Sequence, residues 1–460
     1  MSETLLSIAE SIHSGAVSAQ SLATEALAKA EEFQEFNAFI SLDPEGALAD
    51  ALRVDQAIAA GDTPGRLAGV PLAIKDNINV QDLRTTAGTA GIDFVPSTSA
   101  PIISRLKSEG AVIIGKTNMH ELAFGVTSNN AAFGTVHNPI DPMCIPGGSS
   151  GGTAAAIAAG IVPGGLGTDT AGSVRVPAAL TGLAGFRPTR SLVDQTGIVP
   201  SVPTFDVAGP LAQTVSDAAL LYAVMTGKAA AKQRPVTDIR IGLPTSYFEN
   251  LSPGVCSAVE QALHQVERAG AILKDIDITP ISTASFEVGF PIGFHEMKTA
   301  MTGFLAQYQP GTSLEEIVER IAGKDVKDVY TDAVLGDGAP SPADYKDAVI
   351  RMTEIRRDYL EMLATNQLDI LAFPTTPLEA PPIEGAEETV LLNGEAVPTL
   401  PTFMRNVAST GVCDAPGLTL PLKRTGGSAL PTGLEIDGRP GEDVELLGIG
   451  IGIETLLAEA

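Results

Sequence analysis

The chain has 460 residues, of which 44% are hydrophobic and 18% charged, a composition typical of a folded globular protein rather than a disordered one. Its 29 basic and 55 acidic residues give a formal net charge of −26, which disfavours binding of nucleic acid or of an anionic membrane surface. Three scattered cysteines, Cys144, Cys256 and Cys413, do not form a disulfide framework or a CxxC metal site. With no secretory signal pattern at the N-terminus, a cytoplasmic location is expected.

Helix and strand patterns alternate along the whole chain. Helical periodicity and capping residues predict helices at Ser2–Gly15, Ser18–Phe33, Glu45–Ala60, Ser99–Gly110, Ser150–Ala159, Thr214–Thr226, around Val255–Val266, after the capping box Ser313/Glu316, from Ser341 onward, and at Glu442–Ala460. Apolar runs predict strands at Gly69–Ile74, Ala111–Asn118, Ile161–Gly167, Leu183–Arg187, Arg240–Leu243, Ala271–Ile278, Leu368–Pro374 and Pro431–Ile436. The alternation predicts an α/β protein, an α/β/α sandwich around a large mixed β-sheet, as one domain over 1–460 with a catalytic core region at 65–215.

Glycine and serine are concentrated in the stretch Ile145–Arg175. Ser149 and Ser150 lie in GGSSGG, and Ser173 lies in GTDTAGSVR. Glycine allows the backbone to approach a bound group closely, and the helix predicted to begin at Ser150 can direct its unpaired N–H groups toward that group. We therefore expect this stretch to form the floor of an active site.

These motifs resemble the core of the amidase signature family of serine hydrolases. The resemblance extends over nearly the whole chain, through Val70–Ile78 (VPLAIKDNI), Gly115–Gly125, Phe186–Arg190, Leu368–Pro377, Pro416–Leu422 and Leu430–Asp443. It implies a Ser-Ser-Lys triad in which Ser173 is the acyl-enzyme nucleophile, Ser149 relays the proton and Lys75 is the base. No metal or organic cofactor is expected.

The same resemblance assigns supporting roles around the triad. It implies a cis peptide before Ser149 and an oxyanion hole made by the backbone N–H groups of Thr170, Ala171, Gly172 and Ser173. Ala171 stands where many relatives have glycine, so we expect it to narrow the space near the oxyanion. Side chains expected to brace the loop are Ser150, Asp169 and Arg175.

Histidine is not expected to act as the base. His120 and His137 are interpreted as structural or loop residues, and the G-x-S-x-G spacing at Gly147–Gly151 follows a proline-broken segment that is not a strand. A serine hydroxyl needs a base, and a lysine can provide it if burial lowers the pKa of its ammonium group.

Within the family, Gly115–Pro139 looks most like the branch that hydrolyses indoleacetamide and mandelamide, which are primary amides with an aryl group. Under this interpretation Phe124, Phe133 and hydrophobic residues of the central helices face the aryl ring. The expected partner is a small-molecule amide, with no nucleic acid and no membrane, and a homodimer is one possible assembly by analogy.

Three alternatives stay open. The glutaminase subunit of the tRNA-dependent amidotransferase shares the triad and requires a larger partner chain, but usually has an acidic residue at the place of His120. A non-catalytic module that binds phosphate or nucleotide is the second, although neither a P-loop nor a well-placed GxGxxG is present. A catalytically inactive scaffold is the third, and the three filled triad positions disfavour it.

Overall fold

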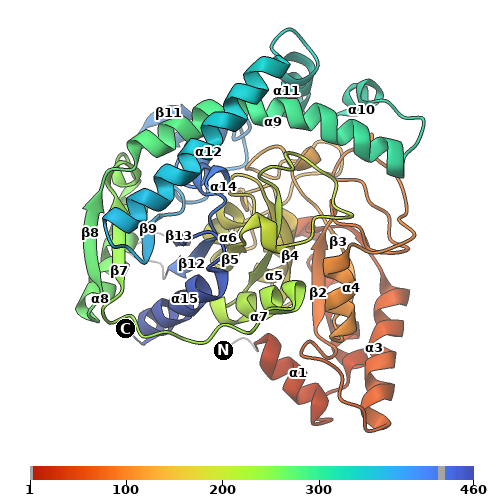
Figure 1. Cartoon of the computed structure of the whole chain (residues 1–460). Helices are drawn as coiled ribbons and strands as arrows, with labels where there is room; N and C mark the ends of the chain where they lie inside the picture. The colour runs from red at the N-terminus through yellow and green to blue at the C-terminus, as the bar shows by residue number, and fades with distance from the viewer. Residues whose placement is uncertain (1–3, 423–429, 460) are drawn as a thin grey trace.

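A single mixed β-sheet of eleven strands runs through the computed structural model, which describes residues 4–422 and 430–459 (Figure 1). In order across the sheet, the strands are β1 (Phe39–Leu42), β3 (Val112–Thr117), β2 (Pro71–Lys75), β4 (Gly164–Asp169), β6 (Val207–Ala212), β5 (Ala184–Arg187), β12 (Gly417–Leu422), β13 (Thr432–Asp437), β9 (Ile370–Pro374), β7 (Arg240–Pro244) and β8 (Ile272–Ile276). β2 is parallel to both of its neighbours, β3 and β4. Each strand from β4 to β9 is antiparallel to the next one across the sheet, in the order β4, β6, β5, β12, β13 and β9. The predicted mixed sheet is therefore confirmed.

Helices pack on both faces of this sheet. α5 (Gly151–Ala158) and α6 (Arg175–Thr181) lie against its central strands on one side, and α7 (Val215–Thr226), α8 (Pro253–Arg268) and α15 (Asp443–Ala458) cover the other. α5 consists almost entirely of glycine, alanine and threonine, and its backbone packs closely. A Cβ at Gly152 would lie 2.2 Å from the carbonyl oxygen of Asn118. Only glycine permits this approach.

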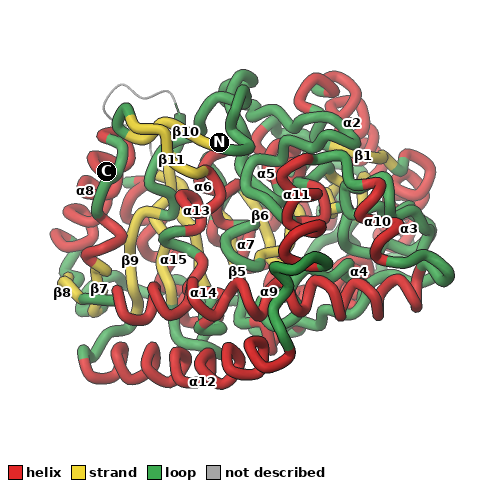
Figure 2. The backbone as a smooth tube through the Cα atoms, turned by 90° about the horizontal axis from the view of Figure 1, so that it is seen from above, coloured by secondary structure: helices red, strands yellow, loops and turns green. Residues whose placement is uncertain are grey.

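The N-terminal helices are α1 (Leu5–His13), α2 (Ala19–Glu32), α3 (Pro44–Ala59) and α4 (Pro101–Ser108). The helices that follow β8 and precede β12 are α9 (Thr279–Tyr308), α10 (Leu314–Arg320), α11 (Lys324–Val329), α12 (Pro342–Thr365), α13 (Thr399–Met404) and α14 (Ala408–Val412). α9 and α12 run side by side in both views (Figures 1 and 2). They share an apolar core with loop residues that include Leu122, Val202 and Phe205.

The elements predicted from sequence are found, with corrections at the ends and some omissions. The first helix begins at Leu5 and is capped by the Thr4 hydroxyl; Ser2, the predicted start, lies outside the described residues. The sequence patterns did not predict the helices α6, α9, α11, α13 and α14. They also did not predict the strands β1, β6 and β12, or the hairpin of β10 (Thr389–Leu392) and β11 (Glu395–Pro398). β6 contains a glycine and a proline, which are unusual inside a strand, and α9 contains Pro291, which is unusual inside a helix. These residues interrupt the sequence patterns by which a strand and a helix are recognised.

No helix within 4–422 and 430–459 combines the length and apolar character needed to cross a membrane.

Candidate active site

Lys75 is the last residue of β2, the buried strand Pro71–Lys75. Its Nζ atom donates hydrogen bonds to Ser149 Oγ at 2.7 Å and to Thr168 Oγ1 at 2.9 Å. Asn77 also donates to Thr168 Oγ1, at 3.0 Å. Because β2 and β4 are neighbouring parallel strands, their carboxyl ends bring Lys75 and Thr168 to the same edge of the sheet.

The Lys75 side chain is fully buried, and desolvation lowers its pKa from 10.5 to about 7, although the negative charges of Asp169 and Asp206 oppose this shift. A substantial fraction of the amine is therefore neutral near pH 7. A neutral amine at hydrogen-bond distance from a hydroxyl can accept its proton.

Ser149 occupies the turn between GG and the start of α5. The Gly148–Ser149 peptide bond is cis, as the family resemblance implies. The Ser149 carbonyl accepts a hydrogen bond from the His120 N–H at 3.1 Å, and the N–H of Ser150 donates to the Ser173 carbonyl at 3.2 Å. The second of these bonds holds the two serine loops against each other. Within the part of the chain that the structure describes, no hydrogen bond joins the hydroxyls of Ser149 and Ser173.

The loop between β4 and α6 presents backbone N–H groups beside Ser173. Among the described residues, the N–H groups of Thr170, Ala171 and Ser173 have no hydrogen-bond acceptor, and all three residues line a cavity. Gly172 differs from the expectation, because its N–H donates to Asp169 Oδ1 at 3.0 Å and Gly172 does not line the cavity. The available donor set is therefore three N–H groups rather than four.

The carboxylate of Asp169 holds this loop in place by accepting hydrogen bonds from the N–H groups of Gly172 and Val174. Arg175 binds its carboxylate with Nη2 at 3.0 Å and Nε at 3.1 Å, and Arg187 donates to its carbonyl at 2.7 Å. Arg175 also pairs with Glu435 at 3.0 Å. Burial alone would raise the pKa of Asp169, but the two guanidinium groups hold it well below its usual range. Arg187 lies in the FRPTR motif, but that motif alone did not predict its contact with Asp169.

The two histidines have other partners, as predicted. His120 Nε2 lies 3.0 Å from Asp325 Oδ2, and its Nδ1 accepts from the Ser128 N–H at 3.2 Å. His137 Nδ1 donates to the Pro142 carbonyl at 2.8 Å. In the described part of the chain, neither imidazole is hydrogen-bonded to a member of the expected triad.

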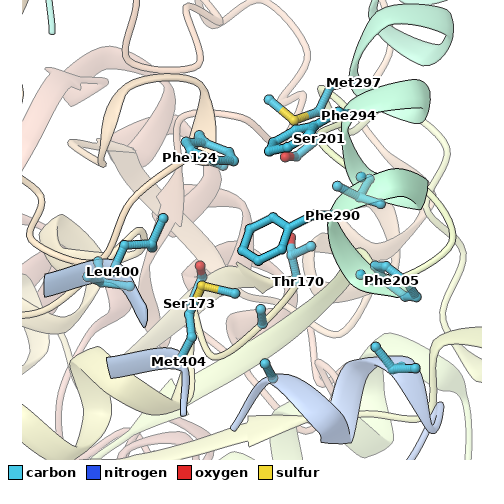
Figure 3. Close-up of a pocket in the computed structure, with 18 of the residues that line it drawn as sticks. Phe124, Thr170, Ser173, Ser201, Phe205, Phe290, Phe294, Met297, Leu400 and Met404 are labelled. Carbon is cyan, nitrogen blue, oxygen red and sulfur yellow. The ribbon is translucent and has the colours of Figure 1, made fainter. Parts of the chain in front are cut away.

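A cavity opens above Ser173 and is walled on one side by α9 (Figure 3). Seven of its lining residues are aromatic or sulfur-containing: Phe124, Phe205, Phe286, Phe290, Phe294, Met297 and Met404. None of the described lining residues is charged. Phe124 lines the cavity as expected, but Phe133 does not and lies elsewhere, where its carbonyl accepts a hydrogen bond from Asn37. The α9 side of the cavity was not predicted, because the sequence patterns did not predict the helix.

The amidase family model matches residues 21–447. The chain belongs to the amidase family. This member is 36% identical to the mandelamide hydrolase of Pseudomonas putida over 449 residues, covering 94% of this chain and 87% of the relative. It is 38% identical to an indoleacetamide hydrolase of Agrobacterium vitis, with 93% and 91% covered. A crystal structure of an amidase superposes with a TM-score of 0.86 at 31% identity, covering 99% of this chain and 100% of that one.

This amidase is accordingly an enzyme that acts on amide C–N bonds, near the branch that the sequence motifs indicated. Its mixed sheet with helices on both faces agrees with the fold of its structural relatives. Among the described residues, no group of three or more His, Cys, Asp or Glu side chains is placed to hold a metal ion.

Proposed function

We propose that this amidase hydrolyses small aryl-substituted primary amides to a carboxylic acid and ammonia. The observation that carries the proposal is the cavity above Ser173, which is rich in phenylalanine and has no charged residue among its described lining residues. Such a lining favours an aryl group over a zwitterion such as glutamine, because burying an unpaired charge is costly. The names of the mandelamide and indoleacetamide hydrolases, both of aryl amides, support the same substrate class.

In the proposed first step, Ser173 Oγ attacks the amide carbonyl carbon. Its proton passes to Ser149 Oγ while the Ser149 proton passes to the neutral Nζ of Lys75. The 2.7 Å contact between Lys75 and Ser149 supports the second of these transfers. The transfer from Ser173 to Ser149 requires a closer approach of the two hydroxyls when substrate is bound, since catalytic hydrogen bonds often tighten only in the complex.

The carbonyl oxygen becomes negatively charged as the tetrahedral intermediate forms. The unpaired N–H groups of Thr170, Ala171 and Ser173 are the proposed donors to this oxyanion. The proton held by Lys75 returns through Ser149 to the leaving nitrogen, the C–N bond breaks, and ammonia departs. Water then attacks the acyl-enzyme by the same route, giving the carboxylic acid and restoring the Ser173 hydroxyl.

Ammonia release from a panel of primary amides tests this proposal. The panel contains indoleacetamide, mandelamide, phenylacetamide, benzamide, a short aliphatic amide and glutamine. We expect preference for the arylacetamides, and loss of turnover in Ser173→Ala with an unchanged circular dichroism spectrum. Ser104→Ala, an exposed serine on α4, is the matched control and should retain full activity. Turnover of glutamine alone, dependent on a partner chain, would replace the proposal with the amidotransferase alternative.

A cytoplasmic location and a homodimeric assembly are further parts of the proposal. The free thiols of all three cysteines are compatible with a reducing compartment. Cell fractionation tests the first of these points, and light scattering coupled to size-exclusion chromatography tests the second.

A further inference from the structure

Asp206 is a buried carboxylate, 8% exposed, that lies between the loop carrying Ser173 and the wall of the cavity. Its Oδ1 accepts a hydrogen bond from Thr170 Oγ1 at 2.6 Å. Its Oδ2 accepts hydrogen bonds from the backbone N–H groups of Ser201 and Val202, both at 2.8 Å. Thr170, Ser201 and Val202 all line the cavity. One side chain therefore fixes the start of the proposed oxyanion loop relative to the opposite wall.

The charge of this carboxylate is balanced by hydrogen bonds rather than by an ion pair. Burial raises the pKa of Asp206 and nearby Glu296 raises it further, while the bonds from Thr170, Ser201 and Val202 oppose the shift. In the described part of the chain, no lysine or arginine lies within ion-pair distance of Asp206. Three donors and no acceptor around the carboxylate fit its ionised form.

The segment that Asp206 anchors is also tied to α9. Glu296, on α9, accepts hydrogen bonds from the N–H of Thr204 at 2.8 Å and from its hydroxyl at 2.6 Å. The hydroxyl of Tyr345, on α12, donates to the same carboxylate at 3.0 Å. Thr204 lies two residues before Asp206. The buried carboxylates of Glu296 and Asp206 therefore hold this short segment between α9, which forms one wall of the cavity, and the proposed oxyanion loop.

We propose that Asp206 is a positioning residue for amide hydrolysis, which holds the Thr170–Ser173 oxyanion loop in register with the cavity wall and places a negative charge near Lys75. This inference rests on the proposed function. Asp206 does not touch the reacting atoms in this arrangement. It acts through Thr170, and through its electrostatic effect on the buried amine.

The two effects predict a specific signature for Asp206→Asn. In Asp206→Asn the amide oxygen can still accept from both backbone N–H groups, but the amide nitrogen cannot accept from Thr170, whose hydroxyl must turn and accept a hydrogen bond from it instead. The oxyanion loop should shift, and kcat should fall about tenfold or more while KM changes less than about threefold. Asp169 and Asp206 are the acids that raise the pKa of Lys75, and Asp169 remains paired with Arg175 and Arg187. Loss of the Asp206 charge should therefore move the acidic limb of the rate profile to lower pH.

The experiment compares wild type with Asp206→Asn, Thr170→Val and Thr170→Ser. Initial rates with phenylacetamide are measured over about pH 5 to 9. In parallel, sulfonylation of Ser173 by phenylmethanesulfonyl fluoride, with loss of fluoride, is followed by intact mass, which needs no amide turnover. Asp275→Asn removes one negative charge at an exposed position of β8 and is the control, with wild-type rates and pH profile expected. Thr170→Ser keeps the hydroxyl and should retain most of the activity that Thr170→Val loses.

A wild-type rate and an unmoved acidic limb in Asp206→Asn would overturn the inference. If Asp206→Asn does not fold, Thr170→Val decides, and equal kcat in Thr170→Val and wild type would then overturn it. A wild type that hydrolyses none of the amides but is labelled at Ser173 would contradict the proposed function, while the pH dependence of labelling in the variants still decides the role of Asp206. A wild type that shows neither turnover nor labelling would overturn both.

Discussion

Lys75 Nζ lies 2.7 Å from Ser149 Oγ, at the end of a strand in which every residue is buried. An ammonium group in water has little tendency to lose its proton at neutral pH. Here desolvation is the larger influence and lowers the pKa of Lys75 to about 7, against the opposing charges of Asp169 and Asp206. The same burial that would destabilise a structural lysine makes this one suited to accept a proton.

The first prediction concerns the pH dependence of hydrolysis. The neutral amine is the proposed base, so kcat/KM should fall as pH drops below about 7, by about tenfold per unit well below the pKa. Lys75→Ala should lose most of the activity and this limb with it, leaving a residual rate that climbs with hydroxide concentration. Initial rates with phenylacetamide across the pH range measure both effects. An acidic limb that persists in Lys75→Ala would identify a different base.

The second prediction concerns the stability of the fold and the buried ion pair of Asp76, the residue after Lys75. Lys116 Nζ lies 3.1 Å from Asp76 Oδ1, and both side chains are fully buried. Lys116→Met leaves a buried carboxylate without its cation, which should lower the free energy of unfolding by about 3–5 kcal/mol. The exposed pair Lys29–Glu25 offers a matched control, since Lys29→Met should cost less than about 1 kcal/mol. Urea denaturation measures both, and similar losses in the two variants would contradict the argument.

Motif residues and strand ends could be predicted from the sequence, and the cavity could not. Lys75 and Ser149 belong to local patterns that fix both their identity and their place at the end of a strand or the start of a helix. The aryl wall depends on α9, whose Pro291 and weak periodicity give no helix signal. Phe124 and Phe133 lie in one motif. Tertiary packing decides that, of these two, Phe124 lines the cavity and Phe133 does not.

The hydrogen-bond partners of buried polar groups also could not be predicted from the sequence. The resemblance implied four oxyanion donors, but the N–H of Gly172 is taken by Asp169. Asp206 belongs to none of the motifs described above, and its proposed role follows from its contacts with the Thr170 hydroxyl and the Ser201 N–H group. Such long-range pairings arise from the fold, not from spacing along the chain.

The third prediction concerns the glycine inside the proposed oxyanion loop. Gly172 has φ +116°, and a Cβ there would lie 2.6 Å from Val407 Cγ2. Gly172→Ala should displace the neighbouring N–H donors and lower kcat by about 100-fold, the scale of losing one oxyanion donor. Gly160→Ala is the control, because its φ is also positive, +71°, but its Cβ meets open space. That variant should lose some stability and keep its kcat. Equal kcat losses in the two variants would argue against a catalytic role for the loop geometry.

The fourth prediction concerns substrate size and Gly289, which lies on the cavity face of α9. A Cβ at Gly289 has no atom within 4 Å, so the Leu side chain of Gly289→Leu should project into the cavity without steric conflict. Helix stability should not fall, because leucine is a better helix former than glycine by several tenths of a kcal/mol. The added side chain would occupy space that the aryl ring needs. We therefore expect KM for phenylacetamide to rise about tenfold while a short aliphatic amide is affected little.

Gly303 provides the matched control on the same helix, since it is exposed, meets open space and does not line the cavity. Gly303→Leu makes the same change in composition and in helix propensity, so it should leave both substrates unaffected. The ratio of kcat/KM for the aryl and the aliphatic amide is measured in wild type and in both variants. This ratio separates steric exclusion of the aryl ring from any change in folding, because a folding defect lowers both values together. If Gly289→Leu lowers kcat/KM for the two amides equally, the cavity beside α9 does not hold the aryl group, and that group must bind on another side of Ser173.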